Sequence, residues 1–213
     1  MSTTAPDRLY RTGVPRFNRS FRALHWAFSL PFMILLVSGI ALALPSFEVL
    51  LSHRELLRSI HLYSAIGLVV LPLFTVVFGD RRSLARDARE IDYWDRLDWM
   101  WLGRSLTFWR GRLPAQGRFN AGQKLNTVLV IAATTGFVVT GVLMWRAELF
   151  PLWLGDVATQ VHDALTLLVI PLVLGHIFMA ALNPRTNGAL GSIFHGRVDR
   201  EWARAHHGRW QPQ

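Results

Sequence analysis

The stretch VHDALTLLVIPLVLGHIFMAALN, residues 161–183, is the last apolar segment of the chain and decides its fold. It is long enough to cross a hydrocarbon core of about 30 Å as a helix, because such a crossing takes about 20 residues. Two histidines, His162 and His176, lie near its ends. The helical segment between them rises about 21 Å in nearly four turns, so both imidazoles are expected on about the same face, at two depths of a membrane.

The composition places the whole chain in the membrane class. Of its 213 residues, 51% are apolar, and the mean hydropathy is +0.26. Both values are too high for an ordinary soluble domain of this size. The chain has no cysteine, which excludes disulfides, iron–sulfur clusters, Cys-ligated zinc and the covalent attachment of c-type haem.

Four apolar windows predict an all-α membrane protein with four spans that form a bundle. The predicted spans cover residues 23–47, 59–79, 125–145 and 161–183. Since no internal repeat or linker divides the chain, we expect residues 1–213 to form a single integral-membrane domain. The N-terminus lacks the pattern of a cleaved signal peptide, so the first span is expected to be retained.

The basic residues predict the orientation of the chain. Of the 23 Lys and Arg residues, 20 lie in the N-terminal segment, the middle connection and the C-terminal tail. The positive-inside rule then places both termini and the middle connection in the cytoplasm. Because these residues are spread over three segments rather than one folded face, no nucleic-acid partner is expected. The Arg-rich tail is expected to be a solvated cytoplasmic end.

The middle connection, residues 80–124, predicts an amphipathic helix in the headgroup layer of the bilayer. Aromatic residues alternate there with Arg and Asp, as is typical of an interfacial helix. These aromatic residues are Tyr93, Trp94, Trp99, Trp101 and Trp109. A plain interfacial linker is the alternative interpretation.

Four of the eight histidines fall into two pairs at matching predicted depths. His61 and His162 lie near the outer surface, and His25 and His176 lie toward the cytoplasmic side. Two imidazoles at one depth are a ligand set for the iron of haem b inside a helical bundle, so the pattern predicts two haems b. No second histidine is predicted at the depth of His53, which lies in the first outer connection.

Each pattern has a second interpretation. A histidine in a span can be a polar group satisfied by a neighbouring helix, which would suit a haem-free membrane anchor or a small transporter. Small residues near the proposed ligands leave room for a macrocycle, or else allow helices to pack closely. These small residues are Gly39, Gly67, Gly136, Gly141 and Gly175.

Short motifs surround these histidines and precede the third span. They are R-x-x-H-W at residues 22–26, R-x-x-H at residues 58–61 and GRFNAGQKLN at residues 117–126. With them the chain resembles the gamma subunit of membrane-bound formate dehydrogenase, a di-haem cytochrome b. The resemblance implies that His61 and His162 hold the outer haem and that His25 and His176 hold the inner haem, in agreement with the pairing by depth.

The resemblance also implies a site for menaquinone or ubiquinone on the cytoplasmic side, at Asn120, Gly122 and Gln123. Side-chain amides and a backbone N–H are suitable donors to a quinone carbonyl, and Lys124 can stabilise a developing negative charge. In the alternative interpretation, residues 120–123 only cap the third span and Lys124 snorkels to the headgroups.

The function implied by the resemblance is electron transfer and quinone reduction in the bacterial inner membrane. An iron–sulfur (beta) subunit would supply the electrons, and a molybdenum- or tungsten-containing (alpha) subunit would oxidise formate, because this chain contains no formate-oxidising chemistry. A higher oligomer of that complex is compatible with the sequence. The nearest alternative is the cytochrome b subunit of a hydrogenase or a thiosulfate-type reductase, which the FNAGQK run at residues 119–124 disfavours.

Overall fold

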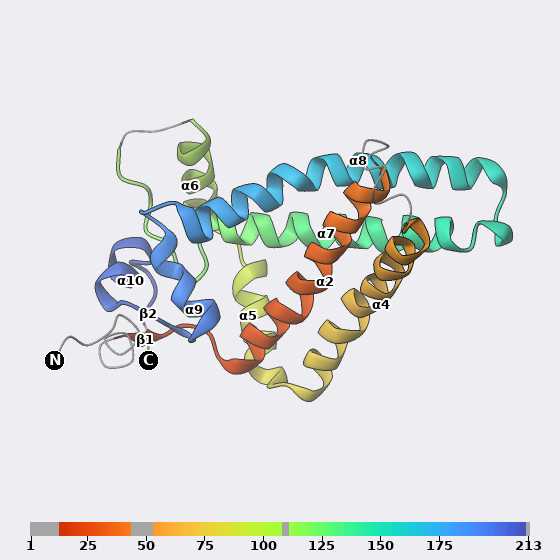
Figure 1. The fold of residues 1–213 in the computed structure, drawn as a ribbon. Coiled ribbons are helices and arrows are strands. Elements are labelled where there is room, and N and C mark those ends of the chain that lie inside the picture. The colour runs from red at the N-terminus through yellow and green to blue at the C-terminus, as the bar shows by residue number, and fades with distance from the viewer. Residues whose placement is uncertain (1–12, 44–52, 108–110, 212–213) are drawn as a thin grey trace. The chain divides into compact units, whose positions relative to one another are not determined.

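The computed structural model describes residues 13–43, 53–107 and 111–211, and nearly all of their regular structure is helical (Figure 1). The long helices and those between them are α2 (Arg19–Ala43), α4 (Arg54–Phe78), α5 (Arg81–Asp92), α6 (Arg96–Leu106), α7 (Ala121–Trp145) and α8 (Leu152–Ile177). The short elements are β1 (Val14–Pro15), η1 (Ala147–Leu149), η2 (Phe178–Leu182), η3 (Asn187–Ala189), α9 (Leu190–Phe194), β2 (Arg197–Val198) and α10 (Arg200–His206).

Among the described residues, four helices are long and apolar enough to cross a membrane: α2, α4, α7, and α8 together with η2. A helix of 25 residues is about 38 Å long and so exceeds the hydrocarbon core. The predicted all-α membrane fold with four spans is confirmed. Each helix begins before its predicted span, at residues 19, 54, 121 and 152. Residues 44–47, the end of the first predicted span, lie outside the described residues.

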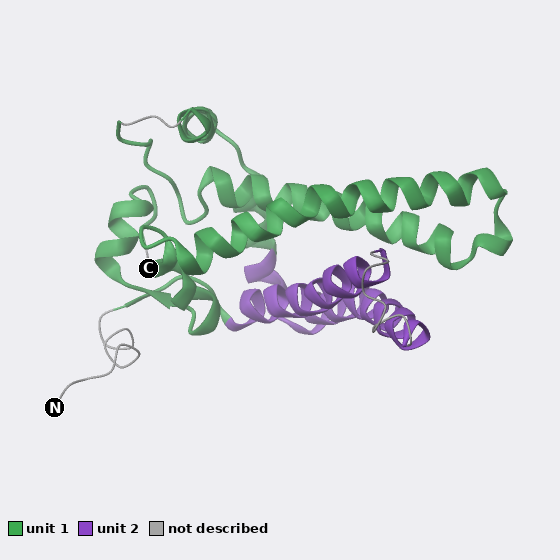
Figure 2. Ribbon diagram, turned by 45° about the horizontal axis from the view of Figure 1, so that its top comes forward, with its two compact units in different colours: residues 1–18, 85–213 green, residues 19–84 purple. Residues whose placement is uncertain are grey.

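The chain divides into two compact units, coloured separately in Figure 2. Unit 2 is residues 19–84 and contains the adjacent helices α2 and α4, while unit 1 is residues 1–18 and 85–213 and contains the adjacent helices α7 and α8. Each unit therefore contributes one pair of membrane-length helices. That residues 1–213 act as a single domain stays a prediction.

The middle connection forms two helices, α5 and α6, where one was expected. Asp95 ends the turn between them and caps α6, since its carboxylate accepts from the backbone N–H groups of Leu97 and Asp98. Asp98 in turn accepts from the N–H of Asp95, which completes a capping box. Trp109 lies outside the described residues, and the position of these helices at a membrane surface stays a prediction.

The tail folds back onto the N-terminal segment within unit 1. Strands β1 and β2 pair antiparallel, with Val14 opposite Val198. These two valines and Ala203 form a small buried core, against which Trp202 and Trp210 pack. The expectation of a solvated tail was wrong, because its scattered apolar residues find partners on a segment about 180 residues earlier in the chain.

Candidate functional site

His61 lies on α4 and faces a serine of the neighbouring helix α2. The hydroxyl of Ser38 lies 2.9 Å from His61 Nδ1. The same hydroxyl donates to the carbonyl of Ile34 at 2.7 Å. A Cβ at Gly39 would come within 3.3 Å of His61 Cε1. Gly39 therefore lets the imidazole lie directly against the backbone of α2.

His162 has the same surroundings in unit 1. It lies on α8, and the hydroxyl of Thr140 on α7 is 2.8 Å from its Nδ1. Thr140 donates to the carbonyl of Gly136 at 2.7 Å, and a Cβ at Gly141 would lie 3.8 Å from His162 Cε1. The ring of Phe137 meets the imidazole edge-on, at 4.9 Å between centroids.

The other two predicted ligands lie near helix ends. His25 is in the second turn of α2, with the hydroxyl of Ser29 at 3.2 Å from its Nδ1. His176 is the penultimate residue of α8, two residues before the π-helical turn η2 begins. His162 and His176 thus share one helix, as predicted. His25 and His61 belong to unit 2, and His162 and His176 to unit 1, so the pairing into two haem sites stays a prediction.

The start of α7 brings together the residues predicted to bind quinone. Asn120 and Gln123 form a capping box, in which each side-chain oxygen accepts from the other residue's backbone N–H at 2.8 and 3.1 Å. These residues therefore cap the third span, as the alternative interpretation expected, and whether they also bind a quinone stays a prediction. Gly122 lies beneath Trp101 of α6, where a Cβ would come within 3.1 Å of the indole.

The capping box uses the side-chain oxygens of Asn120 and Gln123, and it does not use the NH2 groups of these two amides. Gln123 Oε1 also accepts from Arg16 at 3.3 Å, which fixes the orientation of that amide. In the first turn of α7, Ala121 N–H bonds to Gln116 Oε1 at 2.8 Å, whereas the N–H of Gly122 has no acceptor among the described residues. The first turn of a helix offers such unsatisfied donors unless side chains accept from them.

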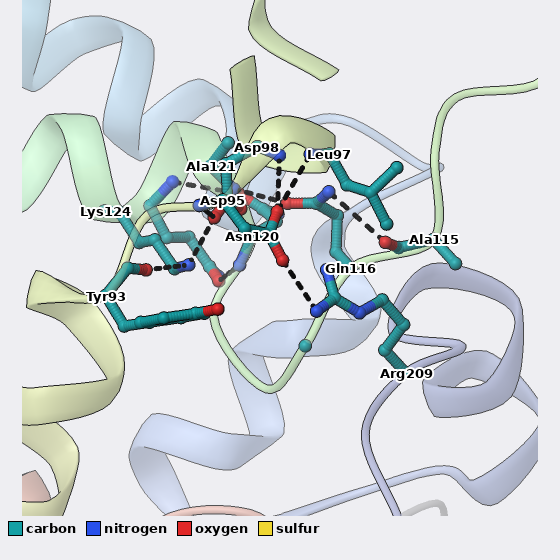
Figure 3. A network of polar contacts seen from close by, with 12 residues as sticks. Tyr93, Asp95, Leu97, Asp98, Ala115, Gln116, Asn120, Ala121, Lys124 and Arg209 are labelled. Atoms are coloured by element: carbon teal, nitrogen blue, oxygen red, sulfur yellow. Dashed lines mark hydrogen bonds and ion pairs between the residues drawn. The ribbon is translucent and has the colours of Figure 1, made fainter. Parts of the chain in front are cut away.

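Lys124 does not snorkel. It is 7% exposed, and its ammonium donates to Asp98 Oδ2 at 2.8 Å and to the carbonyl of Tyr93 at 2.7 Å (Figure 3). Asp98 is only 3% exposed. This buried ion pair links α6 to α7. This pair could not be predicted from the sequence, because Asp98 is one of several acids in an aromatic segment and lies 26 residues from its partner.

A second buried cluster joins Arg16 and His207 to the segment that precedes α7. Arg16 is 3% exposed, and one of its nitrogens, Nη2, donates to the carbonyl of Arg118 at 2.7 Å and to His207 Nε2 at 3.1 Å. Burial and the nearby Arg118 lower the pKa of Arg16 to about 9, so it stays a cation at neutral pH. His207 Nδ1 donates to the carbonyl of Gly117 at 2.6 Å.

A cavity of about 590 Å³ opens beside the Lys124–Asp98 pair within unit 1. Most of its lining side chains are charged. Those charged side chains are Arg86, Arg89, Glu90, Asp95, Asp98, Arg118, Lys124 and Arg209. Arg118 is held by ion pairs to Asp87 and Glu90. Burial raises the pKa of the Asp87 carboxyl, although Arg118 acts against that rise.

Four membrane-length helices among the described residues, three of which carry histidines, define the class as an all-α, multi-pass membrane protein. The chain belongs to the prokaryotic cytochrome b561 family, whose sequence profile matches residues 16–196. Membership in this family implies haem b as the cofactor.

Several relatives cover nearly the whole chain. The cytochrome b556(Fdn) subunit of the nitrate-inducible formate dehydrogenase of Escherichia coli K12 is 27% identical, over 89% of this chain and 86% of the relative. The formate dehydrogenase cytochrome b556 subunit of Haemophilus influenzae is 27% identical, over 93% and 82%. The cytochrome b556(fdo) subunit of Escherichia coli K12 is 25% identical, over 94% and 92%. The predicted resemblance is confirmed by these relatives.

Proposed function

We propose that the chain is the membrane-anchoring cytochrome b subunit of a formate dehydrogenase complex of the bacterial inner membrane. It holds two haems b and conducts electrons from an extracytoplasmic iron–sulfur subunit to a quinone that is reduced on the cytoplasmic side. The observation that carries this proposal is the matching setting of His61 and His162, each with a hydroxyl at Nδ1 and a glycine at Cε1.

The residues at these two positions fit a haem. A haem b supplies a one-electron carrier whose iron takes two axial imidazole nitrogens. His61 and His162 would hold the outer haem, and His25 and His176 the inner one. A Cβ at Gly39 would crowd the imidazole of His61, whereas a Cβ at Gly141 would make only ordinary contact with His162. Histidines within membrane spans are themselves expected to be functional, because an ionisable group there is costly.

The start of α7 supports the quinone site. Asn120 and Gln123 are oriented by the capping box so that their NH2 groups remain for a ligand, and the N–H of Gly122 lies between them in the chain. Three donors suit the carbonyl of a quinone, on which negative charge develops during reduction. The charged cavity beside Lys124 and Asp98 supports access of water and protons to this end of unit 1.

Two variants separate capping from quinone binding. Asn120→Asp keeps an N-cap oxygen but removes the NH2 donor, whereas Asn120→Ala removes both. We expect both variants to retain the haems and to lose quinone reduction, and only Asn120→Ala to lose about 1 kcal/mol of stability. Full turnover in Asn120→Asp would restrict this residue to capping and would require another quinone site.

The donor complex is tested by deletion. A strain lacking this chain is expected to lose formate-dependent quinone reduction and to keep hydrogen-dependent reduction. The reverse pattern would assign the chain to a hydrogenase instead. Loss of neither activity, together with a purified protein that has no Soret band, would favour a haem-free membrane anchor.

A further inference from the structure

Ser38 and Thr140 make the same two contacts, and these contacts determine a hydrogen position. The Ser38 hydroxyl is 2.7 Å from the carbonyl oxygen of Ile34 and 2.9 Å from His61 Nδ1. A hydroxyl has one hydrogen. Two oxygens at 2.7 Å require that hydrogen between them, since a carbonyl has none to offer. The hydroxyl oxygen must therefore accept the hydrogen of Nδ1.

Thr140 repeats this arrangement in the other unit. Its hydroxyl is 2.7 Å from the carbonyl oxygen of Gly136 and 2.8 Å from His162 Nδ1. Because Thr140 and His162 share no element with Ser38 and His61, the two observations are independent. Both helix pairs carry the order hydroxyl residue, glycine and then histidine, at 38, 39 and 61 and at 140, 141 and 162.

We propose that Ser38 and Thr140 are positioning residues that fix the tautomer and ring orientation of His61 and His162, so that each presents Nε2 to the iron of one shared haem. This inference rests on the proposed haem function. A neutral imidazole with its hydrogen on Nδ1 carries the ligating lone pair on Nε2. A hydrogen bond from Nδ1 also makes the imidazole a stronger donor to a metal, which stabilises ferric over ferrous iron.

The test uses the purified full chain, with haem content and the midpoint potential of each haem as readouts. In Ser38→Ala and in Thr140→Ala, we expect the potential of the same one of two haems to rise, with the other unchanged. Ser38→Thr and Thr140→Ser should restore it. Thr75→Ala and Thr134→Ala are matched controls, because within the described part of the chain these hydroxyls bond only to a carbonyl of their own helix.

Each outcome of this test either supports or overturns the inference. Unchanged potentials with both haems present, shifts in different haems, or equal shifts in the control variants would overturn the inference. If an alanine variant loses haem, loss of one haem that the conservative variant restores supports the inference, and loss of both contradicts it. Absence of haem from the unmodified chain would instead refute the proposed function, so the two failures are distinguishable.

Discussion

Single residues differ in how readily their roles can be predicted from the sequence. A histidine inside an apolar span stands out because ionisable groups are rare there, and all four predicted ligands lie on membrane-length helices. Ser38 and Thr140 do not stand out, because serine and threonine are common in such helices and usually bond to their own backbone. Only the packing of one helix against the next reveals that these two also reach a histidine.

Removal of one inner ligand tests the assignment of His25 and His176. His176→Ala is expected to abolish the inner haem and retain the outer one, because an iron that has lost one of two protein ligands is held weakly. Haem quantification per chain provides the measurement. His53→Ala, at the N-cap of α4, is the control and should keep both haems. Two haems in His176→Ala would refute the pairing.

The Lys124–Asp98 pair predicts a large stability difference between single and double variants. Lys124→Met leaves a buried carboxylate without its cation and should cost about 3–5 kcal/mol. Lys124→Met combined with Asp98→Leu should recover most of that loss, which thermal unfolding in detergent would measure. In contrast, Glu148→Ala breaks the exposed pair with Arg146 and should cost at most about 1 kcal/mol. Similar losses in all three variants would contradict a role for burial.

Whole elements could be predicted where a contiguous stretch of sequence is enough to determine them. Apolar length alone identified the four long helices, whereas their first turns were missed because charged residues there ended the predicted windows. In α8, Asp156 and Asp163 lie beyond the first turn but within the N-terminal half, so the helix continues through charged residues that interrupt the apolar pattern. The β1–β2 pairing could not be predicted, since two strands of two residues each carry no periodic pattern.

Docking of the tail is predicted to depend on pH through His207, which is 1% exposed. Burial and the neighbouring Arg16 lower the pKa of His207 to about 3. An unfolded tail would take up the proton near pH 6.5, so the docked state loses stability as pH falls from about 6.5 toward 3. Between pH 6.5 and 5 the loss should be about 2 kcal/mol.

Limited proteolysis of residues 197–211 at a series of pH values measures this dependence. Cleavage should accelerate below pH 6.5 in the unmodified chain. His207→Gln keeps a donor and an acceptor without titrating in this range and should flatten the profile, while His195→Ala, at an exposed histidine away from this cluster, should leave it unchanged. A profile that is flat in the unmodified chain would disprove the role of His207.

At the scale of the whole molecule, the lack of cysteine makes the predicted orientation directly testable. Single cysteines can be introduced as Arg82→Cys, Glu148→Cys and Arg204→Cys, all at exposed positions. A membrane-impermeant maleimide should label only Glu148→Cys in intact spheroplasts and the other two after lysis, because 20 of 23 basic residues lie on the predicted cytoplasmic side. Labelling of Arg204→Cys before lysis would invert the orientation.

The central claim concerns the whole chain: two helix pairs, in units 1 and 2, together carry the four ligands of two haems. The direct measurement is a dithionite-reduced minus oxidised spectrum of the purified protein, with haem quantified per chain as the pyridine haemochrome. Two haems b per chain are predicted. One haem would contradict the four-histidine assignment, and none after haem-supplemented expression would contradict the cytochrome function itself.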